Sequence, residues 1–161
     1  MTEEIRSHVT RRALLGTAGA GVIAALVGID AAAAADLSEV EKANVKVVND
    51  FCAAWKSGDP VKLGSFFADD CVVRMAAHDP TRPRLAGQSA IVDTLKNLFT
   101  RSKVELIVEA TFAKGPLVVN SRIDRIVPQS GSGVRDVYYA GVFFVQNGKI
   151  KEWSDYDVTK V

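Results

Sequence analysis

The stretch LVVNSRIDRIV, Leu117–Val127, decides the fold of this sequence. It is rich in β-branched residues and contains neither glycine nor proline, a composition that favours a β-strand. Turn signals flank it, and the dipeptide Asn147-Gly148 further along is typical of a tight hairpin. We therefore predict a series of hairpins over the C-terminal half. The predicted strands are Val104–Phe112, Leu117–Val127, Val134–Val145 and Ile150–Val158.

The residues before these strands predict helices. Apolar residues recur three and four positions apart between Leu37 and Ser57, which indicates a long amphipathic helix. Ser38 and Glu41 form the sequence pattern of a capping box at its start. The apolar positions of this helix are Val40, Val45, Val47, Val48, Phe51, Cys52 and Trp55.

Three further elements complete the predicted domain. We expect a short helix over Pro60–Phe67, a strand over Cys71–Ala77 and a third helix that begins at Gly87. The fold class is α+β, with three N-terminal helices packed on one side of a curved, mainly antiparallel sheet of five strands. Such a sheet has a sheltered concave face. The apolar side of the third helix consists of Ile91, Leu95, Leu98 and Phe99.

The first 35 residues predict an export signal. Arg11 and Arg12 precede a short apolar stretch rich in Ala and Gly, and an Ala-x-Ala sequence stands before Asp36. The arginine pair resembles a twin-arginine signal, so we expect a mature domain over residues 36–161 in the periplasm or outside the cell. An uncleaved membrane anchor or an amphipathic helix is the alternative. Mass spectrometry of the exported protein, which should begin at Asp36, tests this cleavage.

Composition and charge favour a small-molecule partner. The chain has 161 residues, 48% of them hydrophobic, and a formal net charge of +1, as expected of one soluble domain without a global field for nucleic acid or anionic membrane. Its two cysteines, Cys52 and Cys71, make no disulfide framework and match no zinc-ligand spacing. Two buried free thiols are the expected state, although export would permit a disulfide. We expect no metal and no cofactor.

Polar residues on the predicted strands carry the functional argument. Because alternate residues of a strand project to opposite faces, Asn120, Arg122 and Asp124 share one face. Trp153 and Asp155 share a face of the last strand in the same way. If both faces are concave, an arginine and two carboxylates converge in an apolar pocket. The alternative is that these residues are solvated charges on the outer face of the sheet, as most strand charges are.

Two carboxyl groups bridged by an arginine suit the opening of an epoxide without a cofactor. One carboxylate can deprotonate water for attack on an epoxide carbon, while a second, protonated carboxyl donates to the leaving oxygen. An arginine between them holds both in place and biases their ionisation. The neutral carboxyl should be the more desolvated of the two.

Several motifs resemble the limonene-1,2-epoxide hydrolase family, in their order and nearly in their spacing. They are Asp93–Phe99, Ser121–Asp124, Gly141–Phe143, Asn147–Ile150 and Trp153–Tyr156. The helix segment Phe51–Trp55, followed by Gly58-Asp59, is also similar to the opening of the wider superfamily, which is called nuclear transport factor two-like, SnoaL-like or ketosteroid-isomerase-like. The resemblance covers essentially the whole predicted mature chain and implies a cone-shaped α+β barrel.

The resemblance also implies site residues. It makes Asp124 the general acid, Arg122 the bridging group and Asp155 the base that activates water, which are the residues that the strand-face argument selects. The implied substrate-binding residues are Leu98, Ile126, Val137, Tyr139 and Met75, a mostly apolar set.

One feature of that family is missing. Its members hold the nucleophilic water with a Tyr and an Asn on the first long strand, and the corresponding stretch here, Val72–His78, contains neither. A water held by Asp155 alone is poorly oriented for attack. His78, Asn120 and Tyr139 are candidate substitutes, and Asp157 stands where the family tends to be apolar.

The sequence leaves three functions open. The first is a cofactor-free hydrolase of an apolar epoxide, such as a terpenoid, steroid or polyketide-like molecule. The second is an isomerase or cyclase of the ketosteroid-isomerase or polyketide-cyclase kind, and the third is a secreted module that binds a ligand without catalysis. We expect a small apolar substrate as partner, no nucleic acid, and no stable membrane insertion after cleavage. The resemblance further implies a homodimer, formed through an outer sheet face that carries Tyr138, Val142 and Phe144.

Overall fold

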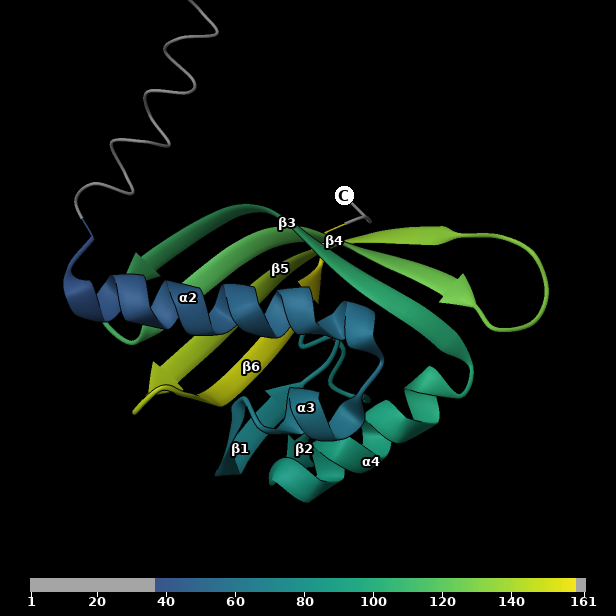
Figure 1. Cartoon of the computed structure of the whole chain (residues 1–161), viewed down its shortest axis with the longest axis horizontal. Helices are drawn as coiled ribbons and strands as arrows, with labels where there is room; N and C mark the ends of the chain where they lie inside the picture. Colours follow the sequence, from purple (N-terminus) through teal and green to yellow (C-terminus); the bar gives the residue numbers. More distant parts are fainter. Residues whose placement is uncertain (1–36, 159–161) are drawn as a thin grey trace, which may run out of the picture. The chain divides into compact units, whose positions relative to one another are not determined.

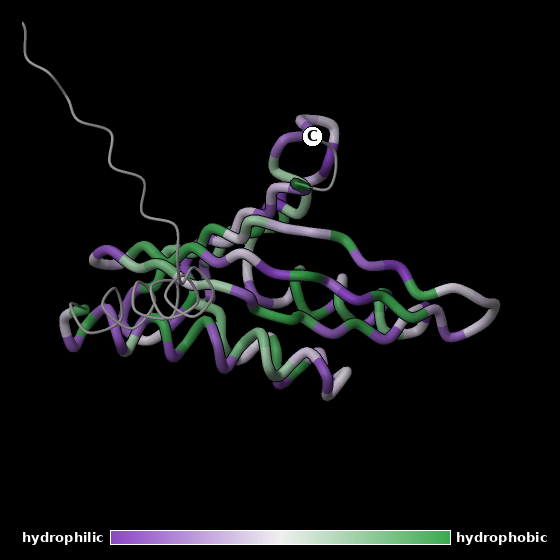
Figure 2. The backbone as a smooth tube through the Cα atoms, turned by 90° about the horizontal axis from the view of Figure 1, so that it is seen from above, coloured by the Kyte–Doolittle hydropathy of each residue, from purple (hydrophilic) through white to green (hydrophobic). Residues whose placement is uncertain are grey.

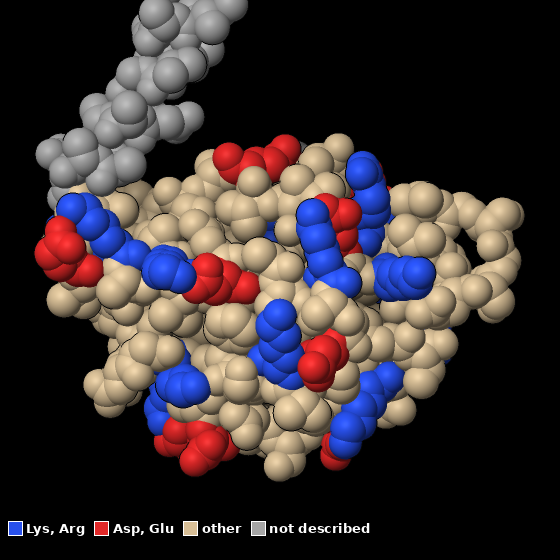
Figure 3. All heavy atoms as spheres, in the orientation of Figure 1, with Lys and Arg blue, Asp and Glu red and all other residues tan. Residues whose placement is uncertain are grey.

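The computed structural model of the protein describes residues 37–158. The predicted export signal over residues 1–35 lies outside the described residues and stays a prediction. Within the described part, no helix is both long enough and apolar enough to cross a membrane. On the face shown in Figure 3, positive and negative side chains are interspersed, in keeping with the near-neutral charge of the chain.

Three helices and one 3-10 turn follow the capping signals of the sequence. The Ser38 hydroxyl accepts the N–H of Glu41, and the Glu41 carboxylate accepts the N–H of Ser38, so the predicted capping box is present. Asp59 caps the second helix, and Gly87, at φ 84°, precedes the third in a backbone region that favours glycine. The elements are α2 (Glu39–Ala54), the 3-10 turn η1 (Trp55–Ser57), α3 (Pro60–Gly64) and α4 (Gln88–Phe99).

The sheet has six strands in the order β2-β1-β6-β5-β4-β3 (Figure 1). Every neighbouring pair is antiparallel except β1 with β6, which is parallel. The α+β class, with N-terminal helices on a mainly antiparallel sheet, is confirmed. The strands are β1 (Phe67–Arg74), β2 (Leu85–Ala86), β3 (Ser102–Lys114), β4 (Leu117–Pro128), β5 (Arg135–Gln146) and β6 (Lys149–Asp157).

The structure corrects three predictions at the start of the sheet. The second helix ends at Gly64 instead of Phe67, because Phe67 is already paired with Ile150 of β6. For the same reason the strand predicted over Cys71–Ala77 begins earlier and ends at Arg74. The sheet has six strands instead of five, since β2 is only two residues long and too short to show a periodic pattern.

The helices cover the concave face of the sheet. In Figure 1, α2 crosses β3 to β6, while α3 and α4 lie beside β1 and β2. Figure 2 shows hydrophobic and hydrophilic residues alternating along the strands, so that one face of the sheet supplies the core. At the centre of this core the ring of Phe51 meets five other aromatic rings at centroid distances of 5.2 to 6.1 Å. These rings belong to Trp55, Phe66, Phe67, Phe143 and Trp153.

Two polar residues fix the first half of α2 on the sheet. The N–H of Gly115, in the β3–β4 turn, donates to Glu41 at 2.8 Å, and the Asn44 carboxamide donates to the Gly115 carbonyl at 3.0 Å. The hydrogen bonds from Gly115 and Ser38 hold the pKa of Glu41 down to about 2. Glu41 and Asn44 therefore occupy the buried stripe of the helix, and Val40, predicted to be apolar core, is 64% exposed.

Candidate active site

The register of β4, β5 and β6 brings the predicted site residues to one face of the sheet. Asn120 and Asp155 flank Gly141, and two residues further along β4 Arg122 lies opposite Tyr139. Arg122 is completely buried and Asp155 is 5% exposed. Both predicted faces are therefore concave, and the alternative of solvated charges on the outer face is wrong.

The guanidinium of Arg122 binds both carboxyl groups. Its Nε donates to Asp124 Oδ1 at 2.8 Å, and its Nη2 donates to Asp155 Oδ2 at 2.6 Å. Nη2 also lies 3.4 Å from Asp124 Oδ2. The planar fork of a guanidinium can reach two acceptors in this way, whereas a lysine offers only a point charge. The structure thus joins the three residues predicted to be catalytic into one hydrogen-bonded unit.

The position of Asp155 is set by the aromatic core. The indole Nε1 of Trp153 donates to Asp155 Oδ1 at 2.6 Å. The Trp153 ring in turn stacks on Phe143, with 5.8 Å between centroids and 8° between planes. Both carboxylate oxygens of Asp155 therefore accept a short hydrogen bond from a group that packing holds still.

Gly141 leaves the space through which the guanidinium reaches across the sheet. A Cβ atom at this position would lie 2.1 Å from Arg122 Nη1 and 2.6 Å from Asn120 Oδ1. Gly141 does not have a positive φ, so room for the guanidinium, and not backbone conformation, requires glycine here. A glycine inside a predicted strand is a signal of close approach that the sequence interpretation did not use.

Asn120 holds the remaining part of the guanidinium. Its Oδ1 accepts from Arg122 Nη1 at 3.2 Å, and its Nδ2 donates to Cys52 Sγ at 3.5 Å. Because both polar atoms of its side chain are hydrogen-bonded within the protein, Asn120 is a poor substitute for a water-holding residue. Cys52 and Cys71 are both free and buried, as expected, and burial raises the pKa of Cys52 to about 11, which keeps its thiol unreactive.

Burial sets the ionisation of the cluster. It raises the pKa of Asp124 to about 6, although Arg122 acts in the opposite direction. Burial also raises the pKa of Asp155, against the hydrogen bonds from Arg122 and Trp153. By itself burial would lower the pKa of Arg122, but the two carboxylates outweigh it and raise that pKa. One guanidinium with one proton shared between two carboxyls has zero net charge, the state that a buried cluster favours.

The sequence predicts that the neutral acid, Asp124, is the more desolvated of the two carboxyl groups, and the structure shows the reverse. The side chain of Asp155, the predicted base, is 7% exposed, and that of Asp124, the predicted acid, is 13% exposed. The more desolvated carboxyl is therefore Asp155, which contradicts the expectation. Hydrogen bonding has the opposite effect to burial, because both Asp155 oxygens accept short hydrogen bonds from N–H groups, and these favour the carboxylate form of Asp155. Asp124 Oδ2 has only the 3.4 Å contact and retains a position for a proton.

The predicted substrate-binding residues are all buried or half-buried. Val137 lies directly across from Asp124 in the register, and the Tyr139 ring lies 5.4 Å from the Arg122 guanidinium. Burial raises the pKa of Tyr139, and the nearby aspartates add to this effect. The other three residues, which are half-buried and pack against the core, are Leu98, Ile126 and Met75.

The stretch that lacks the water-holding pair lies next to the site. The N–H of Ala77 donates to the backbone carbonyl of Asp155 at 2.6 Å. His78 is exposed in the turn that follows, away from the buried cluster. Asp157 is half-buried and lies across from Tyr139 in the register. Of the three candidate substitutes, Asn120 and Tyr139 both lie beside Arg122, and Asn120 already bonds to Arg122 and Cys52.

A hollow of about 340 Å³ opens at the end of α4. Trp55, Phe99 and Val104 line it, and Val104 pairs with Ile126 on the face of β4 that carries Asp124. The remaining lining residues are polar or glycine, and Arg122, Asp124 and Asp155 are not among them. The indole N–H of Trp55 is the buried donor for which the described residues offer no partner. Among residues 37–158, no group of three or more His, Cys, Asp or Glu side chains is placed to hold a metal ion.

This fold and site define an α+β domain in which a buried acid–base cluster lies beneath the helices. The chain belongs to the family described as the SnoaL-like domain, whose family profile matches residues 48–153. Its fold is shared by several solved structures of low sequence identity. An LEH-like epoxide hydrolase of M. tuberculosis is 23% identical, with a TM-score of 0.64, over 73% of this chain and 84% of that chain.

Two further structures with this fold carry other descriptions. A putative polyketide cyclase of Xanthomonas campestris pv. campestris is 18% identical, with a TM-score of 0.62, over 73% of this chain and 92% of that chain. A putative isomerase of Bacillus subtilis is 14% identical, with a TM-score of 0.66, over 74% of this chain and 89% of that chain. The fold is therefore common to proteins described as hydrolase, cyclase and isomerase.

The raised pKa of Asp124 has a consequence for stability. Because its pKa is about 6 in the folded chain and near 4 in the unfolded chain, folding favours the protonated form. We expect this contribution to be complete below pH 4 and to disappear as the pH rises through 6, with a slope of up to about 1.4 kcal/mol per pH unit. Urea unfolding of the wild type and of Asp124→Asn between pH 4 and 7.5 measures it. A difference between the two proteins that does not vary with pH would contradict the assignment.

Proposed function

We propose that the protein is a cofactor-free epoxide hydrolase that adds water to an apolar epoxide in one acid–base step. The observation that carries this proposal is the buried guanidinium of Arg122, which holds the carboxyl groups of Asp124 and Asp155 in one unit. Two carboxyls that share one proton can act as acid and base in the same step. The distant fold similarity to an epoxide hydrolase is consistent with it.

The reaction follows from the state of the two carboxyls. Asp155, as carboxylate, takes a proton from water while the water oxygen forms a bond to an epoxide carbon. The ring C–O bond breaks, and Asp124 gives its proton to the oxygen that leaves, so the product is a vicinal diol. The guanidinium of Arg122 stays charged throughout and balances whichever carboxyl is ionised. A proton must then return from Asp155 to Asp124 before the next turnover.

The hollow at the end of α4 is a candidate site for the substrate body. Its volume of about 340 Å³ is in the range of small-molecule sites. Trp55, Phe99 and Val104 form the apolar part of its lining, and Lys56, Lys103 and Gln129 are among the polar residues that form the rest.

An isomerase or cyclase that uses the same cluster is the second candidate. It is favoured by the absence of a Tyr and an Asn in the stretch Val72–His78 beside Asp155, since moving a proton within the substrate needs no positioned water. Product analysis in ¹⁸O-labelled water separates the two, because hydrolysis incorporates one labelled oxygen and isomerisation none. Ligand binding without turnover would instead support a non-catalytic binding module.

Substitution of the cluster tests its catalytic role. We expect Asp124→Asn and Asp155→Asn each to lower turnover by about 100-fold or more, the usual contribution of general acid–base catalysis. Each single change leaves one carboxylate to balance Arg122, so circular dichroism should stay near that of the wild type, and the melting temperature of Asp124→Asn should differ only by the pH-dependent contribution described above. Arg122→Lys should also lower turnover, because an ammonium cannot bridge both carboxyls.

A matched control is Asp136→Asn, which removes an outer-face carboxylate that is paired with Arg125. This variant should keep full turnover. Activity that survives both Asp124→Asn and Asp155→Asn would mean that the carboxyls are structural, and the hydrolase and isomerase proposals would both fall.

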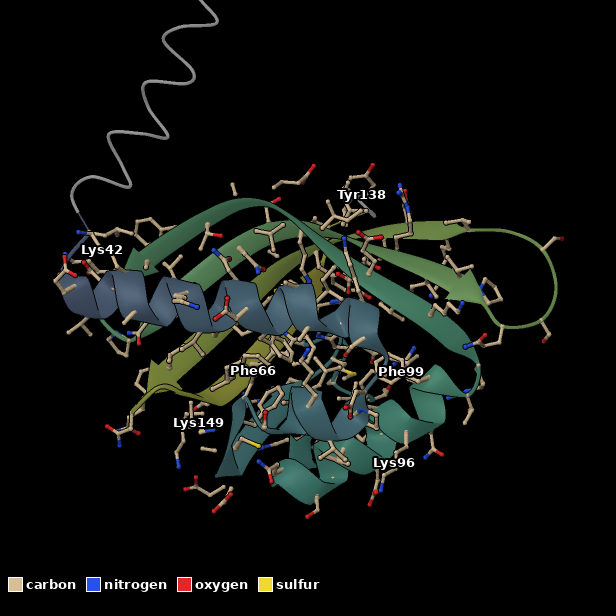
Figure 4. All side chains as sticks on the ribbon, in the orientation of Figure 1. Lys42, Phe66, Lys96, Phe99, Tyr138 and Lys149 are labelled. Atoms are coloured by element: carbon tan, nitrogen blue, oxygen red, sulfur yellow. The ribbon has the colours of Figure 1, made fainter. Side chains whose placement is uncertain are left out.

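We also propose that two copies pair through the outer face of the sheet. Tyr138 and Phe144 on this face are 44% and 38% exposed, and Tyr138 points away from the helices (Figure 4). Phe112 and Tyr156, from β3 and β6, extend the same apolar surface and are 62% and 42% exposed. Apolar area of this kind is commonly covered by a partner.

The assembly has a direct test. We expect light scattering at micromolar concentration to give the mass of a dimer, and Phe144→Asp to shift it to a monomer, because a carboxylate would be desolvated in the interface. Val61→Asp is the control, since Val61 is 66% exposed on α3, away from this face. A wild-type monomer would refute the dimer.

A further inference from the structure

The turn between β1 and β2 carries three arginines around one hollow. The hollow has a volume of about 230 Å³, and Arg74, Arg82 and Arg84 line it together with the single carboxylate of Asp79. It lies apart from the buried Arg122 cluster. The lining carries three positive charges and one negative charge, and Glu152 lies beside Arg74, so the hollow is a locally basic feature on a chain that is nearly neutral.

Two of these arginines flank the pairing of β1 with β2. Val73 of β1 pairs with Leu85 of β2, and Arg74 and Arg84 are the next residues along the chain from that pair. Both line the hollow.

Two of the arginines lie within ion-pair distance of a carboxylate without a hydrogen bond to it. Arg74 lies 3.6 Å from Glu152, and Arg82 lies 3.7 Å from Asp79, distances that are too long for hydrogen bonds. Asp79 instead accepts short hydrogen bonds from the backbone and hydroxyl of Thr81. Arg84 makes no ion pair with any residue in the described part of the chain.

We propose that this hollow binds an anionic group, namely a carboxylate, sulfate or phosphate. Guanidinium groups bind such oxyanions through paired N–H donors, and three of them here have donors to spare. Since a water molecule occupies about 30 Å³ of liquid, the hollow accommodates an oxyanion with several waters.

The position of the hollow suggests where the anion comes from. Met75, which also lines the hollow, packs against the core as a predicted substrate-binding residue, and the Ala77 N–H is bonded to the Asp155 carbonyl. The anion is either a charged group on the substrate or a free ion that orders this turn. The first source rests on the proposed function, whereas the binding site itself does not.

Binding is tested without any substrate. We expect inorganic phosphate to bind the wild type saturably in calorimetry at low salt, and to raise its melting temperature. The double variant Arg82→Gln/Arg84→Gln should bind at least tenfold more weakly and remain folded, because both residues are exposed. The control is Arg101→Gln/Arg135→Gln, which removes two exposed arginines elsewhere and should bind as the wild type does. Equal affinity in all three proteins, or no saturable binding, overturns the proposal.

The source is tested with two epoxides that differ only in a carboxylate. If the substrate carries the anion, the wild type should prefer the carboxylated epoxide, phosphate should compete with it, and Arg82→Gln/Arg84→Gln should raise its KM with little change in kcat. If phosphate binds but neither epoxide is affected, the site serves a free anion. A protein that turns over no epoxide leaves the phosphate result standing, so failure of the proposed function is distinguishable from failure of the site.

Discussion

The whole arrangement depends on one buried charge, the guanidinium of Arg122, which is fully enclosed by the sheet and the helices above it. An uncompensated charge in such a place costs several kcal/mol, so its N–H groups must find acceptors and its charge must be balanced. The structure meets this need with Asp124, Asp155 and Asn120, which together receive Nε, Nη1 and Nη2. The hydrogen bonds that compensate the buried charge of Arg122 also hold the candidate catalytic residues together.

The need to give the Arg122 guanidinium partners also affects how the strands pack. The guanidinium can pass from β4 to β6 only because β5 has no side chain at Gly141. The aromatic core then holds Asp155 from the other side, through the indole of Trp153. Stability and chemistry are thus linked, because a change that moves the guanidinium leaves a charge without partners and also separates the two carboxyls.

A neutral cluster of one guanidinium and two carboxyls with one proton is chemically versatile. It can protonate an oxygen and accept a proton in the same step, which is useful for epoxide hydrolysis and also for isomerisation or cyclisation. The fold is shared by structures described as a hydrolase, a cyclase and an isomerase. Hydrolysis needs a positioned water, whereas proton transfer within a substrate does not, and the stretch Val72–His78 beside Asp155 contains neither Tyr nor Asn.

The sequence by itself determined the class of fold, the four long hairpin strands and the faces of Arg122 and Asp155, because strand alternation and turn chemistry are local properties. It did not reveal that β1 starts at Phe67 or that β2 exists, since pairing with distant strands defines both. Only the tertiary structure decided that the two carboxyls meet on one guanidinium, because register across three strands is a non-local property. It also decided which carboxyl is more desolvated and why position 141 is glycine, since burial and free space depend on what packs from other elements.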